Sequence, residues 1–415
     1  MGTKVVNGQN EVLEVLFEGA DIHRASDVLV FIHGFGTNLH ERGLFDDIVG
    51  SLTDNDKHLT TVRFSWSGFG GSEGEQEETT LQKVSGDFES VLDWVFANKT
   101  INARVAVLGF SMGNIIASNV LASGHYPVQK VVNVSPADFK PSSQSFQKWL
   151  SRPGAKLEGD ILSMPRADGT VTRLNRRFWD TMGGLNYSEK LEKTVSLFPS
   201  TLIRATDDHV VDNSALKTIN FSNIIELTGD HNFSGKKDRP EFLNELAELF
   251  TERNIIVDLD DNVIGCKVRS DINSDDIYRV SGLWVGNDKN QVLLAKRSKY
   301  KSQNPDRWMP VVVSGTVAEG ETYEENIIKE TMEEIGIDLR AKGFELIQKK
   351  LVNTKYNFYA SVFKPILPIA KEEIKFDINE TSELKWFDKG ELKKQIEANP
   401  DDFVPEMSQV TDGLL

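Results

Sequence analysis

One serine of the chain stands where it could act as a nucleophile. Gly109-Phe110-Ser111-Met112-Gly113 follows the apolar run Val105–Leu108 and precedes the helix-like run Asn114–Leu121. A strand that turns sharply into a helix at a G-x-S-x-G sequence exposes the serine hydroxyl at the helix N-terminus, where the dipole and free N–H groups favour negative charge. The flanking glycines keep nearby backbone from colliding at this turn. We predict that Ser111 is the nucleophile of a hydrolase.

Two segments further along the chain could supply the partners of Ser111. Asp207-Asp208-His209 follows the predicted strand Ser200–Arg204, and Asp230-His231 follows the predicted strand Asn223–Leu227. A hydroxyl needs a base that takes its proton, and the imidazolium so formed needs a carboxylate that orients it. The chain order of serine, aspartate and histidine is therefore suited to a catalytic triad.

A turn near the N-terminus could supply the electrostatic part of such a site. His33-Gly34-Phe35-Gly36 directly follows the predicted strand Val28–Ile32. In an open α/β sheet this turn brings the backbone N–H of Phe35 beside that of Met112. Two such donors form an oxyanion hole for the charge of a tetrahedral intermediate. We expect the His33 imidazole to stabilise the turn and to take no part in the chemistry.

The elements that would position these residues alternate between short β-branched runs and amphipathic stretches. Such alternation predicts a mostly parallel sheet with helices on both faces. A long mixed-charge stretch, about 136–195, interrupts it with Trp149, Phe178 and Trp179, and we expect it to form a cap insertion over the site. The helix Asp238–Phe250 closes this domain. Further strand candidates are Thr61–Phe64 and Lys130–Val134.

These residues together resemble the α/β-hydrolase superfamily over about residues 10–250. The resemblance implies that Asp208 is the triad acid, although a slip of one residue would exchange it with Asp207. It implies that His231 is the base; His209 could compete, but we expect it to be exposed. A serine nucleophile favours ester, thioester, lactone or amide cleavage without a cofactor. An apolar acyl pocket is suggested by Trp66, Phe110, Met112 and Phe233. Such residues line most cores as well.

A second group of reactive side chains lies far from the first. Glu330, Glu333 and Glu334 follow one another at helical spacing, so a helix places three carboxylates on one face. Crowded carboxylates repel one another, and a hard divalent cation with oxygen ligands relieves that repulsion. For the three glutamates alone, a solvated acidic helix face would be the better explanation.

The spacing around these glutamates resembles the Nudix box. Gly315 is followed after five residues by Glu321, and seven further residues lead to Lys329-Glu330-Thr331-Met332-Glu333-Glu334-Ile335-Gly336. The resemblance covers Ile255 to about residue 405 and implies an α+β Nudix fold. It also implies hydrolysis of a nucleoside diphosphate linked to another group, with Mg²⁺ or Mn²⁺ as cofactor. The implied metal ligands are Glu330, Glu333 and Glu334, with Gly315 and Glu321 assisting.

This box departs from the family pattern at two positions. Lys329 replaces an arginine and cannot make its bidentate carboxylate bridge, and Thr331 replaces an aliphatic residue. The neighbouring sequence is similar to the branch that includes isopentenyl-diphosphate isomerase. That isomerase needs a cysteine just ahead of the box, where Val311-Val312-Val313-Ser314 has none. We therefore exclude isomerase activity and keep both a working and a degenerate Nudix site as alternatives.

Composition limits the remaining possibilities. The 415 residues carry a net charge of −16, which disfavours nucleic-acid binding. The basic run Lys296–Lys301 could meet a phosphorylated ligand or be a solvated loop. Cys266, the single cysteine, reads as a packed core thiol and fits a reducing compartment, so we expect a cytoplasmic protein. No apolar run is long enough for a membrane span, and the polar Met1-Gly2-Thr3 start predicts no secretion signal.

The sequence thus predicts two fused hydrolase domains. Residues 1–252 form an α/β-hydrolase domain that acts on a small ester or thioester, and residues 253–415 form a metal-dependent Nudix pyrophosphohydrolase. The alternative is a serine hydrolase that is regulated by a Nudix domain which binds a nucleotide ligand without cleaving it. A third possibility is one substrate that carries both bonds.

Overall fold

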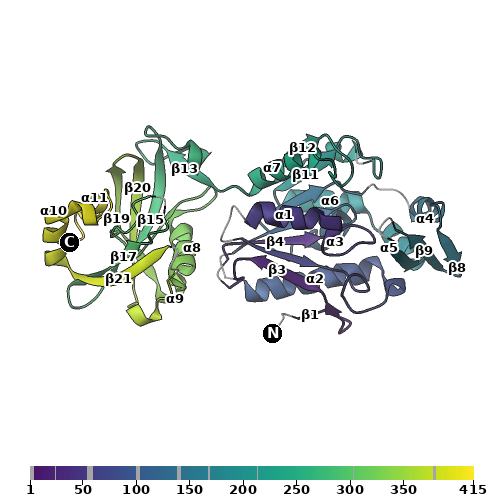
Figure 1. The fold of residues 1–415 in the computed structure, drawn as a ribbon, viewed down its shortest axis with the longest axis horizontal. Coiled ribbons are helices and arrows are strands. Elements are labelled where there is room, and N and C mark those ends of the chain that lie inside the picture. The colour runs from purple at the N-terminus through teal and green to yellow at the C-terminus, as the bar shows by residue number, and fades with distance from the viewer. Residues whose placement is uncertain are drawn as a thin grey trace. The chain divides into compact units, whose positions relative to one another are not determined.

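The computed structural model describes residues 4–23, 25–53, 59–99, 103–137, 142–166, 169–212, 214–301, 303–376 and 380–415. The chain divides into two compact units, Met1–Phe250 and Thr251–Leu415, which are described one at a time (Figure 1). The polar Met1–Thr3 start lies outside the described residues, as do residues 138–141 and 167–168 of the predicted cap.

In the described part of the first unit, the core is a seven-stranded sheet with the order β12-β11-β7-β6-β4-β5-β3. All neighbouring strands are parallel except β3, which pairs antiparallel with β5 at the edge. β-Branched and aliphatic runs form these strands because both faces are covered. Their bounds are β3 Val15–Gly19, β4 Asp27–Ile32, β5 Leu59–Phe64, β6 Arg104–Phe110, β7 Lys130–Val134, β11 Ser200–Ala205 and β12 Asn223–Leu227.

Helices cover both faces of this sheet, as predicted (Figure 1). On one face α2 and α3 pack against Val30 and Val107, and on the other α1 and α7 pack against Phe31 and Leu108. The alternating side chains of β4 and β6 thus divide between two cores. The bounds are α1 Leu44–Thr53, α2 Leu81–Asn98, α3 Gly113–Leu121, α6 Tyr187–Leu197 and α7 Asp238–Phe250. Shorter elements are β1 Val5–Val6, β2 Val12–Leu13, η1 Glu41–Gly43, η2 Gln76–Glu78 and η3 Ser214–Thr218.

An insertion between β7 and α6 has its own small sheet. It consists of α4 Ser142–Leu150, the antiparallel strands β8 Lys156–Glu158, β9 Ile161–Pro165 and β10 Val171–Asn175, and α5 Arg177–Gly183. The following helix α6 differs from the prediction that placed it in the cap. Tyr187 and Leu191 of α6 pack with Ile115 of α3 and Leu202 of β11, so α6 belongs to the layers around the main sheet.

The second unit packs helices around two mixed or antiparallel sheets. In its described residues the larger sheet contains β14-β13-β15-β20-β19, with β18 paired to β15, and the smaller contains β16-β17-β21. The strands are β13 Arg253–Val257, β14 Val263–Val268, β15 Ile277–Leu283, β16 Val285–Gly286, β17 Gln291–Arg297, β18 Val313–Thr316, β19 Phe344–Asn353, β20 Asn357–Pro365 and β21 Thr381–Asp388. The helices are α8 Tyr323–Ile335, α9 Leu339–Lys342, α10 Lys389–Ala398 and α11 Met407–Thr411, with short turns η4 Arg269–Asp271, η5 Lys371–Glu373 and η6 Pro400–Asp402.

The 18-residue α2 carries Lys83, Asp87, Glu89 and Asp93 along its length. Among the described residues, no helix combines the length and apolar character needed to cross a membrane.

Candidate active sites

Ser111 lies in a sharp turn between β6 and α3 whose shape depends on its glycines. Its φ of 50° is in the left-handed region, which is uncommon for a residue with a side chain. A Cβ at Gly113 would overlap the Ile32 carbonyl and would lie 2.9 Å from the carbonyl oxygen of His33. A Cβ at Gly109 would lie 2.7 Å from Oδ1 of Asn114. Both glycines are thus required by the close approach of neighbouring groups.

The structure brings Ser111, His231 and Asp208 into one hydrogen-bonded row. His231 Nε2 lies 3.0 Å from Ser111 Oγ, and His231 Nδ1 lies 2.7 Å from Asp208 Oδ2. A carboxylate accepts and does not donate, so Nδ1 carries the proton and Nε2 accepts the serine hydroxyl proton. The imidazole is therefore oriented to take a proton from Ser111. All three side chains are at least nine-tenths buried.

Asp208 is held in its charged form. Burial opposes its ionisation, but hydrogen bonds from His231 and from the N–H groups of Val210 and Val211 outweigh burial and hold the pKa of Asp208 below its usual value. Its neighbours Asp207 and His209 are both exposed. The loop therefore presents one carboxylate to His231 and turns the two adjacent polar side chains outward.

The backbone N–H groups of Phe35 and Met112 are available as donors. Neither group has a hydrogen-bond acceptor among the described residues. The turn that contains Phe35 touches the nucleophile, since a Cβ at Gly34 would lie 3.3 Å from the Cβ of Ser111. Met112 directly follows Ser111 at the start of α3, where unpaired N–H groups carry positive potential.

Two buried side chains fix the peptide planes of this turn. His33 donates through Nδ1 to the Gly34 carbonyl, 2.8 Å away, and accepts from the Trp66 N–H through Nε2, 3.2 Å away. Burial lowers the pKa of His33 to about 4, so the ring is neutral and structural. On the other side the Glu41 carboxylate accepts the Gly34 N–H at 2.6 Å. Fixing the Gly34 carbonyl also fixes the opposite, N–H end of that peptide, which belongs to Phe35.

The cap reaches the same turn through Arg166. This side chain, which follows β9, donates from Nη2 to the carbonyls of Phe35 and Gly36, the latter at 3.0 Å. A Cβ at Gly36 would overlap the Arg166 guanidinium. Arg166 therefore joins Glu41 in holding the turn that carries a candidate oxyanion donor.

The aromatic side chains suggested for an acyl pocket lie mainly in the core. Trp66, Phe110 and Phe233 are 2% exposed or less, and Trp66 stacks on His33. The rings packed around Phe35 come instead from the cap: Trp149 lies 4.5 Å and Phe178 5.7 Å from it between ring centroids. The tertiary fold decides which rings pack on Phe35, and composition alone does not show it.

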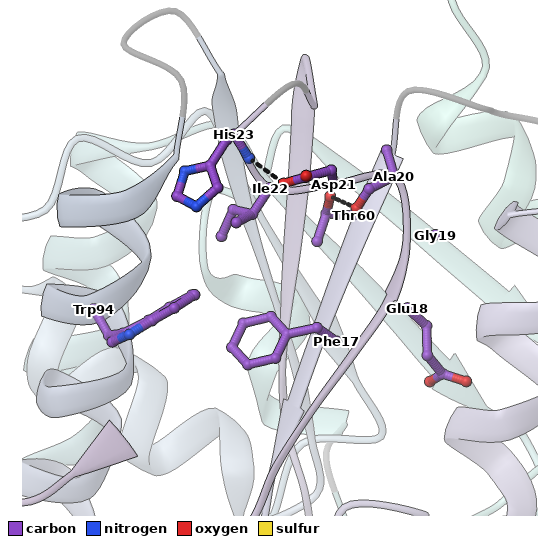
Figure 2. Close-up of a pocket in the computed structure, with 9 residues that line it drawn as sticks. All are labelled: Phe17, Glu18, Gly19, Ala20, Asp21, Ile22, His23, Thr60 and Trp94. Carbon is purple, nitrogen blue, oxygen red and sulfur yellow. Dashed lines mark hydrogen bonds between the residues drawn. The ribbon is translucent and has the colours of Figure 1, made fainter. Parts of the chain in front are cut away.

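A separate cavity of about 250 Å³ lies at the sheet edge between β3 and α2 (Figure 2). Phe17 and Trp94 face one another at its apolar end, with ring centroids 4.7 Å apart, and Asp21 and His23 lie at the other end. None of the predicted site residues lines this cavity. We assign it no part in the chemistry of Ser111.

In the second unit the predicted carboxylates lie on α8. A capping box between Thr322 and Glu325 starts this helix, and Gly336 ends it in a left-handed conformation. A Cβ at Gly315 would overlap the Glu330 carboxyl group. The lack of a side chain at Gly315, in β18, therefore leaves space for Glu330. Gly315 and Glu330 are therefore brought together, as the spacing of the box predicts.

Lys329 and Asn326 organise the carboxylates next to them. Lys329 Nζ lies 3.0 Å from Glu321, 3.2 Å from Glu252 and 3.7 Å from Glu330. The fully buried Asn326 donates to Glu321 at 2.9 Å and to the Thr316 carbonyl at 3.1 Å. A lysine point charge thus makes single contacts to several carboxylates where an arginine would bridge one.

The donor set of α8 fits a divalent cation. Burial raises the pKa of Glu330 to about 8 despite the opposing effect of Lys329, and Glu333 repels it further. Burial and Glu330 likewise raise the pKa of Glu334. A hard cation would relieve this repulsion and take the carboxylate oxygens as ligands. Within the described residues, no three His, Cys, Asp or Glu side chains are already gathered as a metal site, so the fit rests on donor chemistry and on the space at Gly315.

Sequence reasoning missed three residues that shape these sites. Asn326 precedes Glu330 by four positions, and this helical spacing could have identified it. Glu41 and Arg166 had no such signal because they contact the turn at Gly34–Gly36 only through the tertiary fold. Thr331, which departs from the box pattern, bonds to the Ile327 carbonyl at 2.6 Å and so is satisfied within its own helix.

Glu41 gives the first unit a pH-dependent stability. Burial raises the pKa of Glu41 to about 7, above that of a free glutamate, while Gly34, Arg42 and Arg166 act in the opposite direction. Its contribution to stability is therefore present at low pH and is lost as pH rises through about 7. Glu41→Gln keeps an acceptor for Gly34, so it should gain stability relative to the wild type by up to about 3 kcal/mol between about pH 5 and about pH 8.

Urea unfolding of the full chain at both pH values measures this change. The exposed Glu158→Gln of β8 is the matched control and should show no such gain. An equal free-energy difference between Glu41→Gln and the wild type at both pH values would contradict the prediction.

Gly315→Ala tests the space beside Glu330. The added methyl group must displace the Glu330 carboxyl, so we expect Mn²⁺ affinity to fall about tenfold or more while the fold is retained. Calorimetric titration of the full chain with Mn²⁺ measures this, and Gly265→Ala in β14 is the control because a Cβ there meets nothing within 4 Å. Equal Mn²⁺ affinity in both variants would show that Glu330 does not need this space.

Comparison with known proteins separates the same two parts of the chain. Residues 27–198 match the alpha/beta hydrolase fold family, and residues 277–407 match the NUDIX domain family. A prenyl-diphosphate phosphatase from Methanosarcina mazei is 32% identical over 155 residues, 37% of this chain and 89% of that protein. An uncharacterised Nudix hydrolase from Nostoc sp. is 31% identical over 151 residues, 34% of this chain and 87% of that protein.

Among solved structures, Est1E from Butyrivibrio proteoclasticus with bound ferulic acid aligns with a TM-score of 0.49 and 16% identity, covering 60% of this chain and 98% of that one. The two family matches identify both parts of the chain, and the Methanosarcina relative supports the second part. The structural alignment is not needed for this identification. The chain belongs to the NUDIX family, and ahead of its NUDIX domain it carries a domain of the alpha/beta hydrolase fold, so that it combines two hydrolase domains.

Proposed function

We propose that the first domain, residues 1–252, is a serine hydrolase of small carboxylic esters or thioesters. The row of hydrogen bonds from Ser111 through His231 to Asp208 carries this proposal. Ser111 Oγ attacks the substrate carbonyl while His231 Nε2 takes its proton, and Asp208 stabilises the imidazolium. The N–H groups of Phe35 and Met112 receive the negative charge on the carbonyl oxygen.

The second half of the reaction uses the same groups. His231 returns its proton to the leaving alcohol or thiol, and an acyl group stays on Ser111. Water then gives a proton to His231 and attacks the acyl carbonyl, which releases the acid and restores the serine. Each proton taken by His231 is thus given back in the following step, and no cofactor is required.

The two adjacent aspartates allow a sharp test of this assignment. Asp208→Asn keeps the size of the side chain but removes the charge that fixes the His231 tautomer, so kcat for p-nitrophenyl butyrate should fall by about 10⁴-fold. Asp207→Asn is the matched control, because this side chain is exposed and it is Asp208 that bonds to His231. Ser111→Ala should abolish turnover. Equal activity of the two asparagine variants, or unchanged activity of Ser111→Ala, would reject the triad.

For the second domain, residues 253–415, we propose divalent-metal-dependent hydrolysis of a diphosphate. Glu330, Glu333 and Glu334 would hold Mg²⁺ or Mn²⁺, which when bound would neutralise the diphosphate charge and supply an acidic water. Glu321, held by Asn326 and Lys329, would maintain the position of Glu330. The box resemblance suggests a nucleoside diphosphate linked to another group, and the name of the Methanosarcina relative adds prenyl diphosphates as a second substrate class.

Lys329 supports a second candidate, a domain that binds a diphosphate ligand without cleaving it. Its single-point contacts compensate part of the carboxylate charge that a metal would otherwise compensate. Calorimetry distinguishes the binding candidate from the catalytic one. The binding candidate predicts that a diphosphate ligand binds, that it is not turned over, and that its binding changes the esterase rate of the first domain.

Carboxylate variants test the metal-dependent reaction. We expect Glu333→Gln and Glu334→Gln each to lower Mg²⁺-dependent phosphate or diphosphate release by about 100-fold or more, because each loses a ligand charge. The substrate panel contains nucleoside-diphosphate sugars, dinucleotides and prenyl diphosphates. Glu324→Gln, an exposed position of the same helix, is the control. Turnover that survives in both ligand variants would reject these roles, and no turnover of any substrate would favour the non-catalytic candidate.

A further inference from the structure

The cap of the first domain is a basic segment in an acidic chain. Residues 142–183 contain seven lysine and arginine residues and four aspartate and glutamate residues, whereas the whole chain has a net charge of −16. Some of these cations are occupied away from the serine: Arg173 pairs with Glu77 at 2.7 Å, and Arg177 donates to the Glu77 carbonyl at 3.1 Å. Of the others, Arg166 contacts the turn that contains Phe35, and Arg152 stacks on Trp149, whose ring packs on Phe35.

These two arginines lie on an aromatic shelf formed by the rings of Trp149 and Phe35. The shelf is next to the turn Gly34–Gly36, called the oxyanion turn below because it carries the candidate donor Phe35. The Trp149 ring packs on Phe35 with centroids 4.5 Å apart. The Arg152 guanidinium lies over Trp149 at 3.8 Å, and the Arg166 guanidinium lies 5.3 Å from the Phe35 centroid. Stacking on rings orients a guanidinium while leaving its edge N–H groups free for a planar anion.

A third arginine adds to this group from the main domain. Burial lowers the pKa of Arg152, and the charge of Arg42, which follows Glu41 in η1, lowers it further. Within the described residues, neither Arg42 nor Arg152 forms an ion pair with a carboxylate. The nearby Glu41 carboxylate is buried and already accepts the Gly34 N–H. A stacked guanidinium that forms no ion pair is suited to bind an anion.

We propose that Arg152, stacked on Trp149 beside Phe35, recognises an anionic group, a carboxylate or a phosphate, on the ester or thioester that Ser111 cleaves, and that the positive charge of Arg42 assists it. The proposal rests on the esterase function given above and names its substrate class. Arg166 has a different part, because its Nη2 is engaged with the Phe35 and Gly36 carbonyls and holds the oxyanion turn.

Matched esters test this preference. The probes are 4-methylphenyl acetate, 4-acetoxybenzoate and 4-acetoxyphenyl phosphate, which place no charge, a carboxylate or a phosphate on the alcohol side. A second pair, p-nitrophenyl hexanoate and p-nitrophenyl hemiadipate, tests a carboxylate on the acyl side. For each enzyme variant, the ratio of kcat/KM for the anionic ester to that for its neutral partner is measured, so that intrinsic reactivity cancels when variants are compared.

We expect Arg152→Gln and Arg42→Gln each to lower this ratio by about tenfold for at least one anionic probe, mainly through KM. Arg152→Lys, which keeps the charge but loses the planar guanidinium, should fall between Arg152→Gln and the wild type. Lys156→Gln is the control, because it removes one charge from an exposed position of β8 in the same cap.

Three results would overturn the proposal. If Lys156→Gln lowers the ratio as much as Arg152→Gln does, the effect is one of net charge and not of a site. If the ratio is the same in Arg152→Gln, Arg42→Gln and the wild type while all hydrolyse the neutral esters, the esterase function stands and the anion site does not exist. Absence of hydrolysis for every ester would reject the esterase function, and the substrate class with it.

Discussion

The close approach of the Ser111 turn to the end of β4 is the constraint on which the first site depends. Gly113 lies against the carbonyls of Ile32 and His33, and Gly34 lies against Ser111 itself. This contact leaves no space for a Cβ at Gly113 and is accompanied by a left-handed backbone at Ser111. In return it brings the start of α3 beside the turn at Phe35, and with it the two N–H groups proposed above as oxyanion donors. Strained backbone of this kind persists only where its surroundings determine it.

The surroundings here are polar side chains that hold individual peptide groups. His33 holds the Gly34 carbonyl, Glu41 holds the Gly34 N–H, and Arg166 holds the next two carbonyls. The three come from the turn itself, from η1 and from the cap. Because Arg166 belongs to the cap, the position of the cap and the geometry of the oxyanion turn are linked. The second domain also depends on a glycine and a buried polar side chain. Gly315 leaves space for Glu330, and Asn326 holds the Glu321 carboxylate.

The sequence was sufficient for features that depend on local pattern. Apolar runs that end at small residues predicted the strands beside Ser111, Asp208 and His231, and the fold class of both domains is confirmed. Local pattern could not decide between Asp207 and Asp208, because the answer lies in how the Val210 and Val211 N–H groups bend the loop. It could not distinguish a pocket from a core either: Trp66 and Phe233 read like pocket residues but are fully buried. Arg166 contacts a turn 131 residues earlier in the chain, a relation that no spacing rule contains.

The two proposed sites would bind an anionic ligand in opposite ways. A chain with a net charge of −16 repels anions at long range, so any preference for an anionic ligand must come from local groups that act over a few ångströms. In the site proposed for the first domain, those groups are arginines on the Phe35–Trp149 shelf, which would bring positive charge to the substrate directly. In the site proposed for the second domain they are crowded carboxylates, which would attract a cation and through it a diphosphate. A substrate that carries both an acyl ester and a phosphate would satisfy both solutions, and such a molecule gives a chemical reason for joining the two domains in one chain.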